Sequence, residues 1–252
     1  MGKTAHVLGN GDQCVLYKKE QREGLKLLCN LPPFAVDPSE VYATCMVDFK
    51  MMAALTQGSL NLDMYPWILG TRPQIWMNDP RQSVFYLKYA QNVKEFYTTV
   101  PEYAGNATNF NCGHMAVHYA AKKQKADEIN MYGFDTLFDF NMNSVSDLYL
   151  SSDRGQTNNY RLINNWRPVW FHLFQEFPKT KFVLHHTHND LKIPNLDNVE
   201  IITYDSPKTK KPEKDKNGWT VPEKKTAEVG INRKHRRALA KQEKEKQKRG
   251  QK

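Results

Sequence analysis

Short apolar runs alternate with amphipathic stretches along the first 205 residues of the chain. The runs have the length of strands, and most of them end at Gly, Asn or Pro, which interrupt regular structure. They predict strands at residues 5–8, 25–29, 41–49, 74–77, 128–133, 181–185 and 199–204. Helical spacing predicts helices at residues 50–57, 115–125 and 166–177, the second of them opened by Cys112 and Gly113.

This order of elements indicates the fold class. Repeated strand–helix alternation favours an α/β fold, an open and mainly parallel twisted sheet with helices on both faces. The small residues Ala116, Ala120 and Ala121 would let the second predicted helix pack closely on such a sheet. We therefore expect one α/β domain over residues 1–205.

Two segments depart from the pattern. Residues 139–165 are polar, rich in Asn and Ser, and without a stable period. A loop of this length in a compact domain is typical of a functional segment such as a lid. Residues 206–252 mix prolines with many Lys and Glu, a composition that does not bury a core, so we expect a basic, largely disordered tail.

The charge of the chain is concentrated in this tail. The net charge of +9 is by itself typical of a nucleic-acid binder. Residues 206–252, however, hold 17 Lys+Arg and 6 Asp+Glu, a net of +11, and the other 205 residues hold 19 and 21, a net of −2. The charge thus predicts either nonspecific contact between the tail and nucleic acid or a solubilising or recruitment tail that contacts nothing specific. Both leave the chemistry to the near-neutral body.

Several classes of protein are excluded. No stretch approaches 18 apolar residues, so no membrane span is expected. Residues 1–8 run into Gly-Asn-Gly before a signal-peptide core could form. The four cysteines are spaced by 15, 16 and 67 residues without a Cys-x-x-Cys pair, which disfavours a zinc ribbon or a thioredoxin-type site. We expect free thiols and a cytoplasmic location.

Glycines and polar residues follow several predicted strands. They are Gly9, Asn10 and Gly11, then Asn30, Asp48 and finally Gly133, Phe134 and Asp135. In an open α/β sheet, ligands bind outside the carboxyl ends of the strands. The helix start at Cys112 and Gly113 adds N–H groups that suit a phosphate. These positions predict a nucleotide site in which the glycines allow close approach and the asparagines hydrogen-bond a base or ribose.

Five segments, taken in order, resemble the bacterial sialyltransferases of glycosyltransferase family 42. They are residues 8–11, 28–30, 45–49, 111–117 and 129–135. They correspond to a GNGPS-type turn after the first strand, a Cys-Asn pair after the second, a TSG-opened helix, and a strand that ends in Gly-Phe-Asp. In the turn, Asp12 and Gln13 replace the family's Pro and Ser, so a phosphate-facing hydroxyl is missing. The chain also resembles related domains around archaeal pterin pyrophosphokinases. The resemblance covers about residues 5–190.

The resemblance implies a modified Rossmann domain of the glycosyltransferase-A type. Such a domain binds a CMP-sugar donor and transfers the sugar with inversion, without a metal or another cofactor. Carried over, Gly9, Asn10 and Gly11 would contact the donor's phosphate and ribose, and Asn30 its ribose and sugar. Cys112 and Gly113 stand in the place of a Ser-Gly pair. Asp48 lies near a family Asn, where its negative charge is unfavourable beside an anionic donor unless it meets a ribose hydroxyl. Residues 139–165 correspond to the lid.

The chain departs from the family at the general base. The family places a histidine just before the helix predicted at 166–177, where this chain has Tyr160, Arg161 and Asn164. Inverting transfer to a hydroxyl needs a base within hydrogen-bond reach. The candidates are His114, Asp135 and His185. Tyr149 and Tyr160 are the candidates for neutralising the leaving phosphate, as the family's lid tyrosines do.

Two alternatives to the transferase are a metal-binding protein and a non-catalytic binding module. The histidine run at 185–188 and the pair His114 and His118 suggest metal binding, but neither has a carboxylate or cysteine that completes a ligand set, so no metal site is predicted. The other is a different class of protein, a non-catalytic nucleotide-binding module that the basic tail holds on nucleic acid.

Overall fold

The computed structural model describes residues 2–20, 23–30, 36–138 and 162–205. The chain divides into two units, residues 1–206 and 207–252, and all described residues belong to the first. The predicted tail and residues 139–161 of the predicted lid lie outside the described residues. Their expected roles therefore stay predictions.

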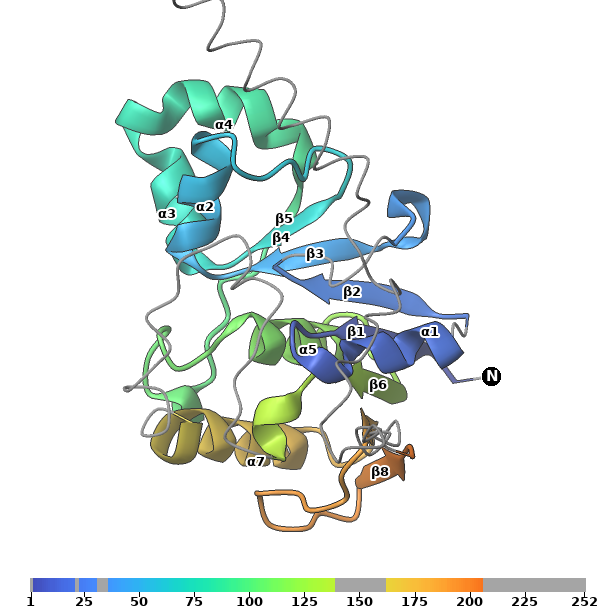
Figure 1. The fold of residues 1–252 in the computed structure, drawn as a ribbon. Coiled ribbons are helices and arrows are strands. Elements are labelled where there is room, and N and C mark those ends of the chain that lie inside the picture. The colour runs from blue at the N-terminus through green and yellow to red at the C-terminus, as the bar shows by residue number, and fades with distance from the viewer. Residues whose placement is uncertain (1, 21–22, 31–35, 139–161, 206–252) are drawn as a thin grey trace, which may run out of the picture. The chain divides into compact units, whose positions relative to one another are not determined.

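Eight strands form a single open sheet (Figure 1). They are β1 (Thr4–Leu8), β2 (Leu25–Cys29), β3 (Ala43–Met46), β4 (Trp67–Leu69), β5 (Val93–Phe96), β6 (Glu128–Tyr132), β7 (Lys181–His186) and β8 (Val199–Thr203). Their order is β5-β4-β3-β2-β1-β6-β7-β8, and every neighbouring pair is parallel. The expected α/β class with an open parallel sheet is confirmed, and the arrangement is Rossmann-like.

The helices connect these parallel strands. They are α1 (Tyr17–Glu20), α2 (Phe49–Thr56), α3 (Thr71–Asn78), α4 (Ser83–Tyr89), α5 (Cys112–Lys122) and α7 (Arg167–Glu176). Short 3-10 helices are η1 (Asp12–Leu16), η2 (Pro38–Glu40), η3 (Pro80–Gln82), η4 (Ala90–Asn92), η5 (Glu102–Ala104) and η6 (Asp135–Leu137), and the π-helical turn η8 (Leu162–Trp166) precedes α7. Within the described part of the chain, no helix has the length and apolar character that crossing a membrane requires.

Two apolar cores cover the two faces of the sheet. One packs α5 and α7 on the sheet, where the small side chains of Ala116 and Ala120 allow a close approach. The other packs α2, α3 and α4 on the opposite face through methionines and aromatic residues such as Met52 and Trp67. In Figure 1 these three helices gather beside β4 and β5, and α7 lies toward the β8 end of the sheet.

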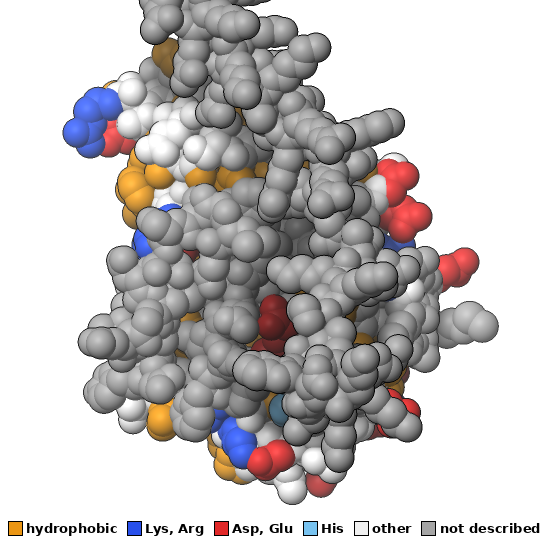
Figure 2. Space-filling view, viewed as in Figure 1, with side chains coloured by type: hydrophobic (Ala, Val, Ile, Leu, Met, Phe, Trp, Pro, Cys, Tyr) orange, Lys and Arg blue, Asp and Glu red, His pale blue; other side chains and the backbone are white. Residues whose placement is uncertain are grey.

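Apolar side chains also remain exposed on α2, α3 and α4. Phe49 is 46% exposed, Ile75 66%, Val84 78% and Leu87 76%. Figure 2 shows orange side chains over this group of helices.

Two of the predicted elements are wrong in detail. Residues 74–77, predicted as a strand, belong to helix α3, because Pro73 in the first turn fits a helix start and the strand β4 precedes it. The strand predicted at 41–49 is shorter, since Asp48 caps α2 and Phe49 is already helical. Strand β5 was not predicted, because its half-exposed residues lack a continuous apolar run.

Candidate functional site

The order of the strands reverses beside β1. Strands β1 to β5 follow one another toward one edge of the sheet, and β6 to β8 follow toward the other. The chain therefore leaves β1 and β6, which are neighbours, on connections that go to opposite sides. In open α/β sheets a ligand crevice forms outside the carboxyl ends of the strands at such a reversal. The residues after β1 and β6 thus lie at the position where this fold class binds ligands.

The glycines after β1 pack against the turn after β6. The Gly9 and Gly11 N–H groups donate to the carbonyls of Tyr132 and Gly133 at 2.7 and 3.0 Å. A Cβ atom on Gly9 would lie 2.5 Å from the Gly133 oxygen, and one on Gly11 would lie 2.7 Å from the same oxygen and from the Asp135 carboxylate. These glycines therefore serve the contact between the two turns, and their N–H groups are occupied by it. Their predicted contact with a nucleotide stays a prediction.

Asn10 lies between the two glycines. It is partly exposed at the carboxyl end of β1, whereas Gly9 is buried. Because the flanking N–H groups are used within the protein, the Asn10 side chain is the part of this turn with the chemistry to recognise a ligand.

Asn30 and Cys112 meet at the next strand end. The Asn30 amide Nδ2 donates to the Cys112 Sγ at 3.1 Å, which joins the end of β2 to the first residue of α5. Asn30 has a left-handed backbone with φ of 58°, a conformation that asparagine tolerates better than most residues. Its N–H donates to the Cys45 carbonyl at 2.9 Å, and its own carbonyl accepts from the Thr44 hydroxyl at 2.7 Å. The structure thus brings together two residues that were predicted for the site from distant parts of the sequence.

The start of α5 is fixed by a reciprocal cap. Asn111 Oδ1 accepts from the His114 N–H at 3.1 Å, and His114 Nδ1 accepts from the Asn111 N–H at 3.2 Å. Gly113 is required by packing, since a Cβ there would lie 2.9 Å from the Phe134 ring. The α5 N-terminus is therefore rigidly held next to the turn that follows β6, with its positive dipole end at the strand ends.

His114 and His185 are poorly placed to act as bases. His114 is fully buried, and because Nδ1 accepts a hydrogen bond, Nε2 carries the proton that it donates to the Trp166 carbonyl at 3.2 Å. Burial lowers the pKa of His114 to about 3. His185 Nε2 donates to Asn130 Oδ1 and its Nδ1 accepts from the Tyr204 hydroxyl, both at 2.8 Å. Neither ring has a nitrogen lone pair left for a substrate proton.

Asp135 lies where the turns after β1 and β6 meet. Its Oδ2 accepts from the Gln13 N–H at 3.3 Å, and its Oδ1 lies 3.8 Å from His186 Nε2 at the end of β7. His186 Nδ1 accepts from the His188 N–H at 2.9 Å, so Nε2 carries the proton and faces the carboxylate. The ring of His186 stacks on Phe138 with centroids 3.9 Å apart.

Sequence reasoning did not select His186 for the site. Successive residues of a strand point to opposite faces, so His185 and His186 have different surroundings although they are adjacent. The apolar residues that precede them in β7 predict the strand, but they do not indicate which of the two histidines faces Asp135.

The β1–β6 turn region is electronegative. The pKa of the buried Cys14 thiol is raised to about 12, first by burial and then by the charges of Asp135 and Asp12. A negative field of this kind disfavours a phosphate directly beside Cys14. An anionic ligand would be placed better toward Asn30 and α5.

A small cleft of about 20 Å³ lies at the carboxyl ends of β3, β4 and β5. It is lined by residues that follow these strands and by α5, among them Val47, Arg72, Thr99 and Met115. Among the described residues that line it, Arg72 is the only cationic one, and it lies in the first turn of α3. Arginine binds phosphates through its planar set of N–H donors. In the sequence, Arg72 is a single arginine after strand β4, which was not predicted, and a single arginine does not indicate a binding site.

Two further predicted residues have other positions. Asp48 caps α2, where its carboxylate accepts from the Lys50 N–H at 3.0 Å, so its predicted ribose contact stays a prediction. Tyr160, like Tyr149, lies outside the described residues. Among the residues that are described, no group of three or more His, Cys, Asp or Glu side chains is arranged to hold a metal ion.

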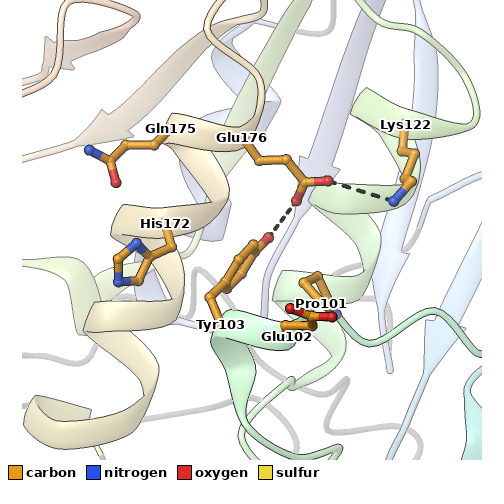
Figure 3. Close-up of a pocket in the computed structure, with 7 residues that line it drawn as sticks. All are labelled: Pro101, Glu102, Tyr103, Lys122, His172, Gln175 and Glu176. Carbon is orange, nitrogen blue, oxygen red and sulfur yellow. Dashed lines mark hydrogen bonds and ion pairs between the residues drawn. The ribbon is translucent and has the colours of Figure 1, made fainter.

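A larger cavity lies apart from the strand ends. It measures about 480 Å³ and is bordered by η5 and by the last turns of α5 and α7 (Figure 3). Its lining residues are Pro101, Glu102, Tyr103, Lys122, His172, Gln175 and Glu176. None of the described residues in the turns after β1, β2 and β6 borders it.

Glu176 organises the polar groups of this cavity. It accepts from the Tyr103 hydroxyl at 2.8 Å and lies 3.6 Å from Lys122 Nζ. Behind it, His118 Nε2 lies 3.1 Å from the carboxylate and His118 Nδ1 lies 2.6 Å from the Tyr97 hydroxyl. Burial lowers the pKa of His118, an effect that the Glu176 charge opposes. Of the residues drawn in Figure 3, Tyr103, Glu176 and Lys122 are thus engaged with one another, which suits a structural network between α5 and α7.

In comparisons with models of known protein families, with curated proteins and with solved structures, nothing matched the chain. The case for its function therefore rests on the strand reversal and the side chains around it.

Proposed function

We propose that the chain binds a nucleotide sugar, of the CMP-sugar type, at the carboxyl edge of its sheet and transfers the sugar with inversion. The observation that carries the proposal is the strand reversal beside β1, with Asn10 next to it and the amide of Asn30 on Cys112 at the start of α5. The ordered resemblance to the sialyltransferases supports the choice of donor.

The charges suggest how the donor would lie. Its phosphate would face the N-terminus of α5 and Arg72, away from the Asp12 and Asp135 carboxylates. Asn10 and Asn30 supply both amide donors and carbonyl acceptors, which suit the hydroxyls of ribose and sugar. Arg72 and the N-terminus of α5 would then stabilise the charge on the leaving phosphate, so the proposed transfer needs no metal ion for this purpose.

Asp135 is the best placed of the three predicted bases. In the proposed transfer its carboxylate takes the proton of an acceptor hydroxyl, whose oxygen bonds to the anomeric carbon while the bond to the CMP phosphate breaks. His186, whose proton-bearing Nε2 lies 3.8 Å away, would orient the carboxylate. His114 and His185 are withdrawn from this role because both ring nitrogens are hydrogen-bonded.

The same histidines favour a second candidate function. A nucleotide-binding module without transferase activity needs no base, and the full engagement of His114 and His185 fits such a protein. Its basic residues 206–252 would hold it on nucleic acid. A salt-sensitive shift of DNA in a gel, lost when 206–252 are deleted, tests that partner; a shift that survives the deletion would contradict it.

Calorimetry with CMP-, UDP- and GDP-sugars tests donor binding. We expect a CMP-sugar to bind, and Asn10→Ala and Arg72→Ala each to weaken binding by about tenfold. The matched control is Asn78→Ala, because Asn78 is exposed at the last residue of α3. Absence of binding by any of the three donors, or equal binding by wild type and Asn10→Ala, would refute the proposal.

Donor hydrolysis separates the enzyme from the module. An enzyme releases free sugar slowly without an acceptor, and Asp135→Asn should abolish this release while leaving CMP-sugar binding in place. Tight binding of the donor with no release by wild type would support the module instead.

A further inference from the structure

Three of the four cysteines gather at the carboxyl edge. Cys29 ends β2 and is the register partner of Cys45 in β3, and both are buried. Cys112 is the first residue of α5 and is partly exposed. Cys14 is separate, beside Gly133. The sequence spacing of 15, 16 and 67 residues gave no sign of this cluster.

The three thiols have different surroundings. Cys112 Sγ accepts the Asn30 amide at 3.1 Å and lies at the positive end of an 11-residue helix. An oriented hydrogen-bond donor and a helix N-terminus both stabilise negative charge that develops during a reaction. The pKa of Cys29 is raised well above its usual value, first by a hydrogen bond with the Cys112 side chain and then by burial. The pKa of Cys45 is raised by burial. Cys112 is thus the accessible nucleophile, and Cys29 is a protonated thiol beside it.

The backbone holds this arrangement in place. Asn30 directly follows Cys29, and its two backbone hydrogen bonds, to the Cys45 carbonyl and from the Thr44 hydroxyl, fix the left-handed residue that carries the amide. The amide is therefore aimed at Cys112 by the same strand end that supplies Cys29. A donor that is already oriented stabilises developing charge without reorganising.

We propose that Cys112 reacts with hydroperoxides and that Cys29 resolves the product to an intramolecular disulfide. This proposal is independent of nucleotide binding. The Cys112 thiolate attacks one peroxide oxygen, the O–O bond breaks, and a sulfenic acid forms while hydroxide leaves. The Cys29 sulfur then attacks Cys112 Sγ, the S–S bond forms, and water leaves. For hydrogen peroxide, two thiols are oxidised by two electrons and the peroxide is reduced to two waters.

Differential alkylation of the full-length reduced protein tests the proposal. After one equivalent of hydrogen peroxide, free thiols are blocked, the disulfide is reduced, and the released thiols are labelled and located by mass spectrometry. We expect Cys29 and Cys112 to carry the second label, and Cys14→Ser to leave the result unchanged. An unmodified Cys112, or a disulfide that joins it to Cys45 or to a second chain, would overturn the proposal.

Two variants separate reactivity from folding. In Cys29→Ser the sulfenic acid lacks its resolving thiol, so a dimedone probe should label Cys112; absence of label in this folded variant contradicts the proposal. Asn30→Asp keeps the shape of the side chain and removes the amide donor, so alkylation of Cys112 at neutral pH should slow by about tenfold. An unchanged rate would show that the amide does not activate the thiol and would also count against it.

Discussion

The turns after β1 and β6 and the junction of β2 with α5 lie at the same edge of the sheet but are built in different ways. In the first region glycines bring two backbones together, and Gly9 and Gly11 donate to carbonyls at 2.7 and 3.0 Å. In the second region side chains meet, with the amide of Asn30 on the sulfur of Cys112. The first region closes the sheet tightly, whereas the second presents polar groups and a thiol.

The difference shows that a Gly-Asn-Gly turn can serve either ligand binding or packing. A Gly-Asn-Gly turn after a first strand suggests phosphate binding, yet here its glycines satisfy a packing requirement between two turns. In the proposed site, side chains rather than these glycines would contact the ligand or react, among them Asn10, Asn30, Arg72 and Asp135. Substitutions of Gly9 or Gly11 should therefore affect folding, and substitutions of these side chains should affect ligand binding or transfer.

The largest expected effect is the loss of stability in Gly9→Ala. The new Cβ would lie 2.5 Å from the Gly133 carbonyl oxygen, which belongs to backbone that cannot rotate away. We expect a loss of about 3 kcal/mol in the free energy of unfolding, measured with urea. Gly105→Ala is the matched control, because Gly105 has a φ of 71° and open space around its missing Cβ, so it should lose only about 1 kcal/mol. Equal losses would contradict a packing role for Gly9.

The next effect is a pH dependence of stability carried by His114. Folded His114 binds a proton only near pH 3, whereas an unfolded histidine binds one near its usual pKa of 6.5. The unfolded state therefore holds more protons between these values, and stability should fall as the pH falls, by up to about 1.4 kcal/mol per pH unit from this residue. The stability present above pH 6.5 is lost progressively down to pH 3.

His114→Gln isolates this contribution. Glutamine at this position still accepts from the Asn111 N–H, as in a capping box, but does not titrate. His118, whose pKa is also lowered, contributes in the same direction in both proteins. Urea unfolding at pH 7.5, where both forms of position 114 are neutral, supplies the baseline. Identical slopes of stability against pH for wild type and variant would refute the assignment.

Much of the fold can be predicted from sequence, and much less of the site. The buried strands β1, β2, β6 and β7 can be predicted from their apolar runs, because parallel strands are covered on both faces. Short β4 and half-exposed β5 carry no such signal, so the cleft that includes Arg72 could not be predicted. Nor do the positions of His186 and Cys29 in the sequence reveal their partners. The pairing of β6 with β7 brings His186 to Asp135, and the packing of α5 on β2 brings Cys112 to Cys29.

A smaller effect distinguishes the backbone of Asn30 from its side chain. Asn30→Gly and Asn30→Ala both remove the amide that contacts Cys112, but only alanine must also accept the φ of 58° at a steric cost. We expect Asn30→Ala to be less stable than Asn30→Gly by about 1 kcal/mol in urea unfolding. If the two variants were equally stable, the left-handed conformation would not be enforced by the strand end.

The smallest effect concerns the cavity between α5 and α7. Tyr103→Phe removes the hydrogen bond to the partly exposed Glu176 and should lower stability by about 0.5 kcal/mol. CMP-sugar binding should be unchanged in calorimetry, because this cavity shares no residue with the carboxyl edge. Weakened binding in Tyr103→Phe would move the ligand site to this cavity.

Hydrogen exchange of the full chain with and without a CMP-sugar tests the central claim most directly. Binding at the strand reversal predicts slower exchange in the peptides that contain Asn10, Asn30, Arg72 and Cys112, and no change in those that contain Tyr103 and Glu176. Protection confined to the Tyr103 and Glu176 peptides, or no protection at saturating ligand, would contradict a nucleotide-sugar site at the carboxyl edge.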